Sequence, residues 1–568
     1  MKKFLSYIRP HLPVMSLQFL VKFGGTIIEL FLPWILSTIL DDAVPSGNMN
    51  SVYRWGGAMI LCALLALIAN VVANRMAIRT SRNVIIQLRH DLFEKALQLS
   101  SSQTDRLTIP SLISRLTTDT YNVHQLLDNM QRLLIRAPIL LLGGLVITAL
   151  LEPVLTLILI AALPFLGLVI WYTTRIGVPM YTEAQTALDR LIRTVQENIH
   201  GVRVIKALSK GDYEIAKFDQ SNRDLIQKEQ RAGITMAVTN PGMNLILNLG
   251  LALVIVLGAF RVNAGLTQPG RIVAFLSYIT IIITALMRVP RLFVIYSKGS
   301  ASAKRIAEVL EMSETMKIGM RDPVPGPYHI EFKDVCFSYN KVRNNLTNIR
   351  FGLKRGETLG IIGPTGSGKS TLLNLLLRFY DADSGEIRLS GENIGGIPPE
   401  VLHTKFGVVF QNDFLFADTI RANIDFGRRL TDAQIEMAAG TAQMDFVSEK
   451  SEGFSSLLTI KGANLSGGQK QRLLIARALA ANPEILMLDD CSSALDYKTD
   501  AELRHALAKG FKDTTTIVVA QRISSIMAAD KIMVLDEGRI IGYGSHAELL
   551  STCGSYREIY EAQMGVVM

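Results

Sequence analysis

The sequence has little cysteine and little charge for its length. Its 568 residues include four cysteines, and 19% of the residues are charged. Cys62, Cys336, Cys491 and Cys553 are too scattered to predict a disulfide framework or a zinc site. By contrast, 49% of the residues are hydrophobic and the mean hydropathy is +0.27, which exceeds the apolar content of an average soluble protein.

A nucleic-acid-binding function is not expected, although the formal net charge is +9. The sequence has no stripe of alternating arginine and aromatic residues of the kind that binds single strands. A cleavable signal is not expected either, because the apolar run after Lys2 and Lys3 is too long and has no small-residue cleavage site.

Six apolar segments are long enough to cross a hydrocarbon core, which needs about 20 helical residues. We predict an all-α membrane domain of six transmembrane helices at residues 14–40, 55–78, 133–151, 154–172, 238–260 and 272–289. Only Glu152 and Pro153 separate the third segment from the fourth, which predicts a tight hairpin.

The loops between these segments predict the orientation of the chain. Residues 79–132 and 175–231 are long and rich in Arg and Lys, whereas 41–54, 152–153 and 261–271 are short. Basic loops stay in the cytoplasm, so we expect a multi-pass protein of the cytoplasmic membrane with a cytoplasmic N-terminus and C-terminal domain. Apolar residues continue at helical spacing into both long loops, which predicts long intracellular helical extensions.

Polar residues inside the apolar segments have two interpretations. Lys22 and Glu29 lie two turns apart in the first segment. Asparagines repeat every four residues in the second and fifth segments, at Asn70, Asn74, Asn240, Asn244 and Asn248. These side chains could line a translocation cavity or form interhelical hydrogen bonds, and the sequence leaves both open.

The chain changes character near residue 302. A polar stretch with Pro323, Pro325 and Pro327 indicates a linker. Short β-like runs then alternate with helical segments, the pattern of an α/β domain. We therefore predict a membrane domain at 1–301, a linker at 302–327 and a nucleotide-binding domain at 328–568.

A complete phosphate-binding loop follows the apolar strand predicted at 358–362. Its candidate ligands are Gly363, Pro364, Thr365, Gly366, Ser367, Gly368, Lys369, Ser370 and Thr371. The glycines let backbone amides turn onto phosphate at a helix N-terminus. We expect ATP here, with Lys369 at the β- and γ-phosphates and Ser370 offering an oxygen to Mg²⁺. Asp489, which ends a second apolar strand, is the expected carboxylate of the magnesium shell.

Between these motifs lies a second signal, Leu465 followed by Ser466, Gly467, Gly468 and Gln469. Here the whole chain resembles a half-transporter of the exporter type from the ATP-binding cassette family, whose signature is LSGGQ. The resemblance implies a six-helix transmembrane domain fused to an α/β P-loop cassette. It also implies that Tyr339 stacks on adenine, that Gln411 contacts Mg²⁺ and the attacking water, and that Asp496 ends a loop reaching across a dimer.

The same resemblance implies a partner chain. Two cassettes are expected to sandwich two ATPs, each between the phosphate loop of one chain and the signature of the other. Ser466, Gly467, Gly468 and Gln469 would then face ATP bound by a second half-transporter. Residues 112–119 and 201–208 resemble the segments that contact the cassettes, and both are apolar at helical spacing.

Two catalytic positions depart from the family pattern. Asp490 stands where the family usually has a glutamate that polarises water, and Gln521 replaces the switch histidine. The shorter side chain withdraws its carboxylate by roughly 1.5 Å, and a misplacement near 1 Å can cost about a hundredfold in rate. Gln521 has no proton that titrates near neutral pH.

The pattern resembles the degenerate-site subunit of heterodimeric multidrug exporters, with Asp490, Gln521 and Gln411 as its catalytic candidates. We expect export of a small amphipathic molecule with a different chain as partner. A slow homodimeric exporter of lipids or peptides and a mainly regulatory ATP-binding subunit remain alternatives. The cargo itself cannot be assigned from the sequence.

Overall fold

The protein is described by a computed structural model that covers residues 2–287, 289–313, 326–411, 414–491 and 495–565. The chain divides into two compact units. We call residues 1–98 and 107–312 the membrane unit, and residues 99–106 and 313–568 the cassette unit.

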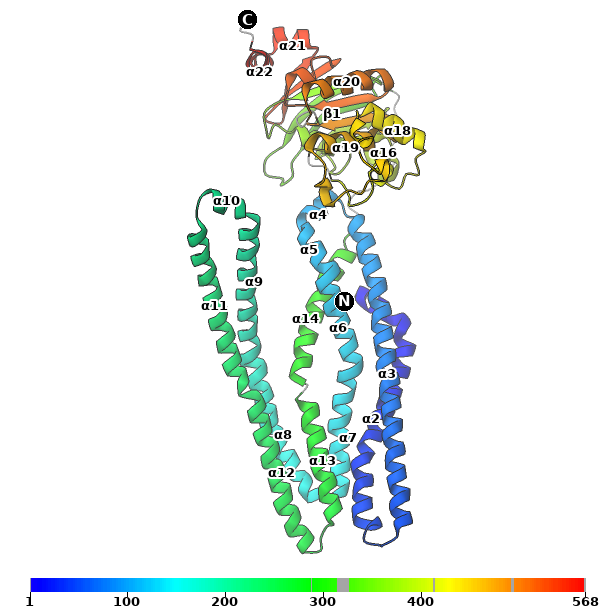
Figure 1. Ribbon diagram of the computed structural model, residues 1–568, viewed down its shortest axis with the longest axis vertical. Coiled ribbons are helices and arrows are strands. Elements are labelled where there is room, and N and C mark those ends of the chain that lie inside the picture. Colours follow the sequence, from blue (N-terminus) through cyan, green and yellow to red (C-terminus); the bar gives the residue numbers. More distant parts are fainter. Residues whose placement is uncertain (1, 288, 314–325, 412–413, 492–494, 566–568) are drawn as a thin grey trace. The chain divides into compact units, whose positions relative to one another are not determined.

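The membrane unit is entirely helical in its regular structure (Figure 1). Its helices are α1 (Lys2–Ile8), α2 (Leu12–Thr38), α3 (Met49–Leu97), α5 (Ile109–Ser114), α6 (Thr120–Asn129), α7 (Ile135–Leu151), α8 (Pro153–Tyr172), α9 (Val178–His200), α10 (Val202–Ala207), α11 (Gly211–Ala237), α12 (Thr239–Asn263), α13 (Pro269–Leu286) and α14 (Val289–Leu310).

Six helical stretches of the described chain are long and apolar enough to cross a membrane, which confirms the predicted six-helix membrane domain. They are Lys3–Ala43, Met49–Leu97, Ile109–Leu151, Pro153–His200, Gly211–Asn263 and Pro269–Leu286. Several of them run well past the apolar segment that the sequence indicates. The sixth ends at Leu286, short of the predicted residue 289, and residue 288 lies outside the described residues.

The predicted tight hairpin at Glu152 is confirmed, since α7 ends at Leu151 and α8 begins at Pro153. Glu152 is 2% exposed and accepts hydrogen bonds from Arg261 (3.2 Å) and from Thr267. A buried carboxylate needs such partners, because an unpaired buried charge is costly. The α7–α8 turn is therefore tied to the turn between α12 and α13.

Interhelical hydrogen bonding explains two groups of polar residues in the membrane helices. Lys22 Nζ of α2 donates to the side-chain oxygens of Asn70 (2.8 Å) and Asn74 (3.1 Å) of α3. Glu29 pairs with Arg136 of α7. These contacts join three helices, as expected for polar side chains in an apolar bundle. The second group of asparagines, on α12, is exposed and is not given a role: Asn240, Asn244 and Asn248.

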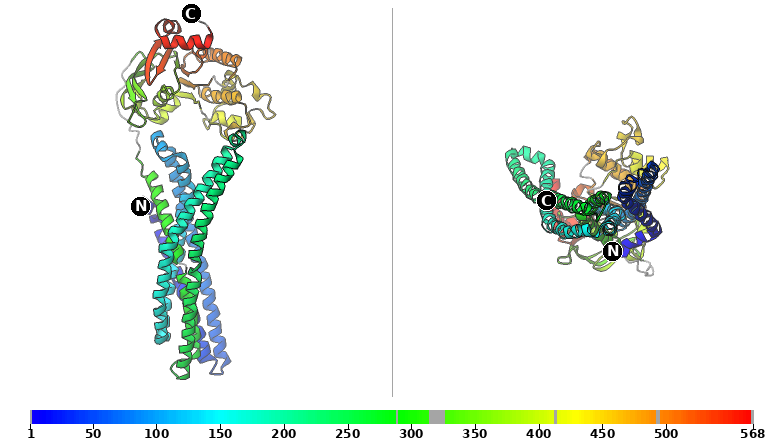
Figure 2. Two further views of the ribbon diagram at one scale, coloured as in Figure 1. Left: turned by 90° about the vertical axis from the view of Figure 1, so that its left-hand side faces the viewer. Right: turned by 90° about the horizontal axis from the view of Figure 1, so that it is seen from below.

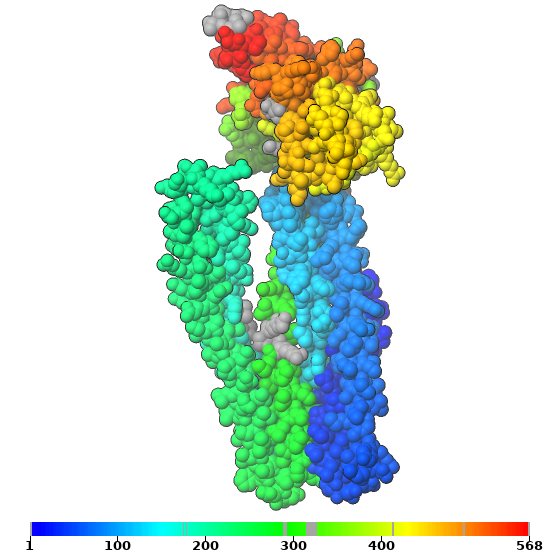
Figure 3. All heavy atoms as spheres, viewed as in Figure 1, coloured from blue at the N-terminus to red at the C-terminus, as the bar shows by residue number. Residues whose placement is uncertain are grey.

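Helices α9 and α11 lie side by side and are joined at their tips by α10 (Figures 1 and 2). They continue α8 and α12 beyond the apolar segments, and the space-filling view shows them diverging from α3 and α6 (Figure 3). The predicted contact segment 201–208 forms this tip, where Val204 is 60% and Leu208 64% exposed.

The other predicted contact segment, 112–119, lies close in sequence to a part of the chain that groups with the cassette. It belongs to the membrane unit, where Asp119 is 1% exposed and pairs with Arg305 of α14. The segment that groups with the cassette lies just before it, at Leu99–Arg106, and includes most of α4 (Ser101–Leu107). Its Asp105 accepts a hydrogen bond from Tyr380. Contact of residues 112–119 with a cassette stays a prediction.

The stretch predicted as a linker, residues 302–327, begins within a helix. Helix α14 continues from Val289 to Leu310, so residues 302–310 of the predicted linker are helical. Residues 314–325, the middle of that linker, lie outside the described residues.

The cassette unit contains two sheets. An antiparallel sheet has the order β2-β1-β4-β5, and a six-stranded sheet has the order β10-β9-β3-β8-β7-β6 with β10 antiparallel to its neighbour. The strands are β1 (Ile330–Phe337), β2 (Leu346–Leu353), β3 (Thr358–Ile362), β4 (Ser384–Leu389), β5 (Glu392–Asn393), β6 (Phe406–Val409), β7 (Ile485–Asp489), β8 (Thr515–Val519), β9 (Lys531–Asp536) and β10 (Arg539–Gly544).

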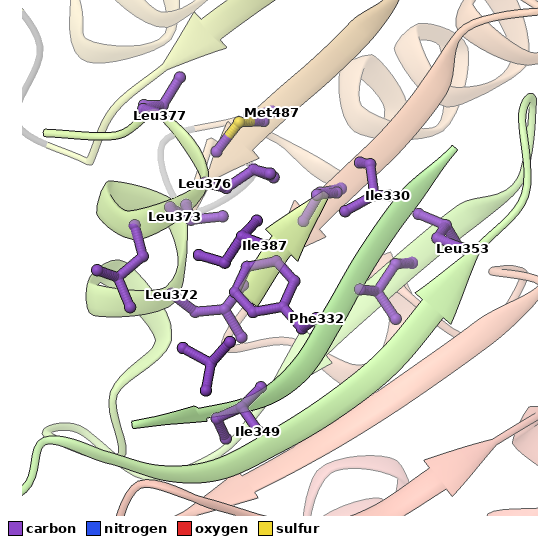
Figure 4. Packing of buried hydrophobic residues seen from close by; sticks show 14 of the residues in the cluster. Ile330, Phe332, Ile349, Leu353, Leu372, Leu373, Leu376, Leu377, Ile387 and Met487 are labelled. Atoms are coloured by element: carbon purple, nitrogen blue, oxygen red, sulfur yellow. The ribbon is translucent and has the colours of Figure 1, made fainter. Parts of the chain in front are cut away.

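The remaining helices of this unit surround the sheets. They are α15 (Lys369–Leu376), α16 (Pro399–Thr404), α17 (Ile420–Asp425), α18 (Asp432–Thr441), α19 (Gly467–Leu479), α20 (Tyr497–Gly510), α21 (His546–Thr552) and α22 (Gly554–Met564). Figure 4 shows how α15 is anchored, with Leu372 and Leu376 packed beside Phe332 and Met487 in the core. The helix that follows the phosphate loop is thereby fixed against both sheets.

Candidate nucleotide site

The phosphate loop joins β3 to α15, and two of its glycines, Gly363 and Gly368, leave no room for a side chain. A Cβ added to Gly363 would lie 2.0 Å from the carbonyl oxygen of Leu535. Gly368 has φ +104°, a left-handed conformation that side chains rarely adopt. The loop therefore turns tightly into α15 and presents its backbone amides at the helix N-terminus, where anions bind.

Lys369 lies across this loop. Its Nζ donates to the carbonyl oxygens of Gly363 and Pro364, both at 2.8 Å. Burial lowers the pKa of Lys369, while Asp489 and Asp490 act in the opposite direction. Phosphate oxygens are stronger acceptors for an ammonium group than neutral carbonyls, so Lys369 can exchange these bonds for bonds to nucleotide.

Ser370 and Asp489 lie where a magnesium ion would be held. Ser370 Oγ donates to Asp489 Oδ2 at 3.3 Å, and Asp489 is the last residue of β7 and 6% exposed. Burial raises the pKa of the Asp489 carboxyl, and the Ser370 hydrogen bond opposes this. A hydroxyl and a carboxylate are hard oxygen ligands of the kind that Mg²⁺ takes beside phosphate, so the residues fit the ion.

A cavity of about 520 Å³ opens beside the loop and collects most of the predicted residues. Its lining includes Gly363, Pro364, Thr365, Gly366, Gly368, Lys369, Ser370, Thr371, Gln411, Asp489, Asp490 and Gln521. Ser367 is buried and lies outside this lining. Phosphate-binding, magnesium-binding and catalytic candidates thus share one concave surface.

The two unusual catalytic residues contact each other. Gln521 Nε2 donates to Asp490 Oδ2 at 2.7 Å, and Gln411 Nε2 reaches the same oxygen at 3.5 Å. Asp490 has φ +53° just after β7, and burial raises the pKa of its carboxyl, an effect opposed by the Gln521 hydrogen bond and by Lys369. The sequence placed these residues near one phosphate but did not predict their direct contact.

Tyr339, the predicted adenine-stacking residue, lies at the edge of this region. It lines an adjacent cavity of about 500 Å³, and its hydroxyl is 3.4 Å from Thr371 Oγ1. Its ring packs edge to face against Phe337 and Tyr380, with centroids 4.8 and 5.0 Å apart. The aromatic ring is therefore held next to the helix that carries the phosphate loop.

The signature forms a separate surface of the cassette. Ser466 caps α19, and a reciprocal pair of hydrogen bonds joins it to Gln469. Gly467 and Gly468 begin the helix, so their amides point out of its N-terminus. Among the described residues, the lining of the phosphate-loop cavity contains none from this signature.

Asp496 caps α20 by accepting a hydrogen bond from the Thr499 amide at 3.1 Å. Ser493 and Ala494 of the same predicted loop lie outside the described residues. Five residues of the cavity lining were not predicted as site residues: Asn345, Ile362, Val519, Ile559 and Gln563. Two of them come from the C-terminal helix α22, where no motif marks them.

Comparisons with known proteins agree with this geometry. The family profile for the ABC transporter transmembrane region matches residues 15–286, and the ABC transporter profile matches residues 346–493. The chain belongs to the ABC transporter family. It is a half-transporter of the exporter type, in which one membrane domain is fused to one ATPase domain.

Relatives of similar length support the same assignment. The ABC transporter ATP-binding protein YfiB of Bacillus subtilis is 35% identical over 570 residues, covering 100% of this chain and 99% of the relative. The putative ABC transporter ATP-binding protein exp8 of Streptococcus pneumoniae is 30% identical over 578 residues, covering 100% and 98%. The fold is similar to that of a bacterial Atm1-family ABC exporter with ATP bound, with TM-score 0.81, 24% identity and 99% of both chains covered.

As a family member this ABC exporter is a multi-pass membrane protein that binds ATP and couples an ABC ATPase domain to transport. ABC exporters work as dimers. The separation of its signature from its own phosphate-loop cavity is consistent with that requirement.

Proposed function

We propose that this chain is one half of a heterodimeric exporter, with a slow ATP site of its own and a signature that completes the partner's faster site. The observation that carries the proposal is the shared oxygen of Asp490. Both Gln521 and Gln411 direct their side-chain amides at Asp490 Oδ2, at 2.7 and 3.5 Å.

These contacts disfavour efficient water activation. A general base must bring an oxygen within hydrogen-bond reach of the water that it deprotonates. Asp490 is one methylene shorter than the usual glutamate, and one of its oxygens is already bonded to Gln521. Gln521 is neutral at every physiological pH, so it cannot gain or lose a proton beside the phosphate as a histidine can.

The signature, by contrast, has the features needed to bind phosphate. Helix α19 is 13 residues long, and its first turn is fixed by the bonds between Ser466 and Gln469. The free amides and the helix dipole at such an N-terminus attract anions. Because this surface lies outside the chain's own phosphate-loop cavity, it can serve only ATP held by another chain.

Magnesium and cargo are part of the same proposal. Ser370, Asp489 and Gln411 would hold Mg²⁺, which when bound neutralises charge on the transferring phosphate.

A cavity of about 520 Å³ in the membrane unit supports a small amphipathic cargo. Most of the residues that line this cavity are apolar, such as Leu134, Leu141 and Leu286, and the polar groups of Asn129 and Tyr296 join them. The basic loops support a cytoplasmic N-terminus and cassette in the cytoplasmic membrane.

Nucleotide release from the assembled transporter tests the proposal. The chain is purified together with a co-expressed second half-transporter, loaded with radiolabelled ATP and chased with unlabelled ATP. We expect two release phases, the slower one removed by Lys369→Ala in this chain. A stable, active complex of this chain with itself and a single release rate would instead identify the slow homodimer, and bound ATP without cargo-stimulated turnover would identify a regulatory subunit.

A further inference from the structure

The C-terminal helix α22 forms part of the nucleotide cavity. Ile559 and Gln563 lie four residues apart, on one face of the helix, and both line the cavity. Tyr556 is fully buried, and Ile559 packs with it against a cluster that contains Ile523. The helix is thereby anchored beside the loop that carries Gln521.

Gln563 holds that loop through its backbone. Its Oε1 accepts from the Ile523 amide at 2.7 Å, and its Nε2 donates to the Gln521 carbonyl at 2.8 Å. The orientation of the side-chain amide follows from these partners, because a backbone N–H only donates and a carbonyl only accepts. One side chain therefore fixes both ends of a three-residue segment.

The fixed segment points the Gln521 side chain at the catalytic end of the cavity. Gln521 Nε2 donates to Asp490 Oδ2 at 2.7 Å, and Asp490 follows directly after Asp489. Since the lysine of a phosphate loop meets the β- and γ-phosphates and the strand-end carboxylate shares their magnesium ion, the third phosphate of ATP belongs at this end. ADP has no group there.

We propose that Gln563 is a positioning residue of the nucleotide site, which holds Gln521 where it favours binding of ATP over ADP. The inference rests on ATP binding by this chain and does not depend on a heterodimeric assembly. It assigns a role to the end of α22 that the nucleotide-binding motifs do not cover.

The test measures affinities of the full-length chain for Mg-ATP and Mg-ADP by displacement of a fluorescent nucleotide. Gln563→Met removes both hydrogen bonds at nearly unchanged length. The expected result is a five- to tenfold fall in the ratio of ATP to ADP affinity, about the worth of one hydrogen bond, with ADP affinity changed less than about twofold. Glu558→Gln, at an exposed position of the same helix, should leave the ratio unchanged.

Two further variants guard against a merely structural effect. Gln563→Glu keeps an acceptor for the Ile523 amide but loses the donor to the Gln521 carbonyl, so it should also lower the ratio. In a Gln521→Ala background, Gln563→Met should change the ratio by less than about twofold, because coupled residues are not additive. Equal weakening of ATP and ADP, additive effects in this cycle, or an unchanged ratio in both Gln563 variants would overturn the proposal.

Discussion

The cassette has two candidate nucleotide-binding surfaces, and their side chains differ in the chemistry that they can support. The phosphate-loop surface has tight glycines, a lysine across the loop and a serine–aspartate pair, so it is well built for binding. Its catalytic end, however, has Asp490 bonded to a neutral Gln521. The signature surface has a capped helix N-terminus, and its five residues match the family signature at every position.

This difference separates ATP binding from ATP hydrolysis within one domain. Binding depends on backbone amides, a fixed positive charge and hard oxygen ligands, and these are present. Hydrolysis also needs a carboxylate oxygen placed against water, and a shift of about 1 Å can cost a hundredfold. In the proposed heterodimer, the other half would supply the faster hydrolysis.

The largest expected effect is on the signature surface. Ser466→Arg puts bulk and misplaced charge at the N-terminus of α19, and should reduce ATP turnover of the assembled transporter about a hundredfold or more. The control is Ser545→Arg, which breaks the equivalent capping box of α21, away from the nucleotide surfaces. Similar losses in both variants would mean that lost helix capping, and not the signature, explains the effect.

The next effect is on binding at the phosphate loop. Lys369→Ala removes the point charge at the β- and γ-phosphates and should weaken ATP binding to this chain about ten- to a hundredfold, as expected for a charged hydrogen bond. Photolabelling of this chain with an azido-ATP analogue measures it. Lys509→Ala, at an exposed position of α20 in the same unit, is the control and should label normally. Undiminished labelling of Lys369→Ala would contradict the assignment of the loop.

A gain of function should follow when the catalytic end is restored. The double change Asp490→Glu with Gln521→His lengthens the carboxylate and removes the amide that occupies it. The partner's catalytic glutamate is replaced by glutamine, so that turnover in this chain's site is measured. That turnover should rise about tenfold, a part of the roughly hundredfold or more that a well-placed general base contributes. Gln521→Asn keeps an amide and serves as the control. No rise would contradict the proposal that Asp490 and Gln521 limit hydrolysis at this site.

The smallest effect concerns pH and the stability of the cassette. His329 is buried, its Nδ1 lies 2.7 Å from Thr515 Oγ1, and burial lowers its pKa. The folded state therefore binds a proton less readily than the unfolded state, whose histidine titrates near 6.5. Stability at this site is complete above about pH 6.5 and falls as the pH drops below it.

His329→Gln should therefore flatten this acid limb. Thermal unfolding at pH 7.5 and 5.5 measures it, with each kcal/mol worth about 2–4 °C in a domain of this size. His505→Gln, on α20, is the comparison variant. An unchanged slope in His329→Gln would exclude this histidine as the source of acid sensitivity.

The sequence predicted those parts of the molecule that are marked by patterns among neighbouring residues. Hydropathy and helix length identify the membrane spans, and a strand, a glycine loop and a helix in succession identify the phosphate site. Sequence reasoning missed contacts between distant segments. The sequence does not indicate that Leu99–Arg106 groups with the cassette unit, and the bonds from Gln563 to the Gln521 loop depend on where α22 packs. Neither produces a pattern in the sequence.

The most direct test compares two variants of this chain in the assembled transporter. Asp490→Asn changes the site proposed to be slow, where little catalysis would remain to be lost, whereas Ser466→Arg changes the surface proposed to close over the partner's ATP. Steady-state ATP turnover should stay within about threefold of wild type in Asp490→Asn. A twofold change in rate corresponds to well below 1 kcal/mol of activation free energy. It should be nearly abolished in Ser466→Arg. Equal loss in both variants, or full turnover in Ser466→Arg, would contradict the division of labour between the two surfaces.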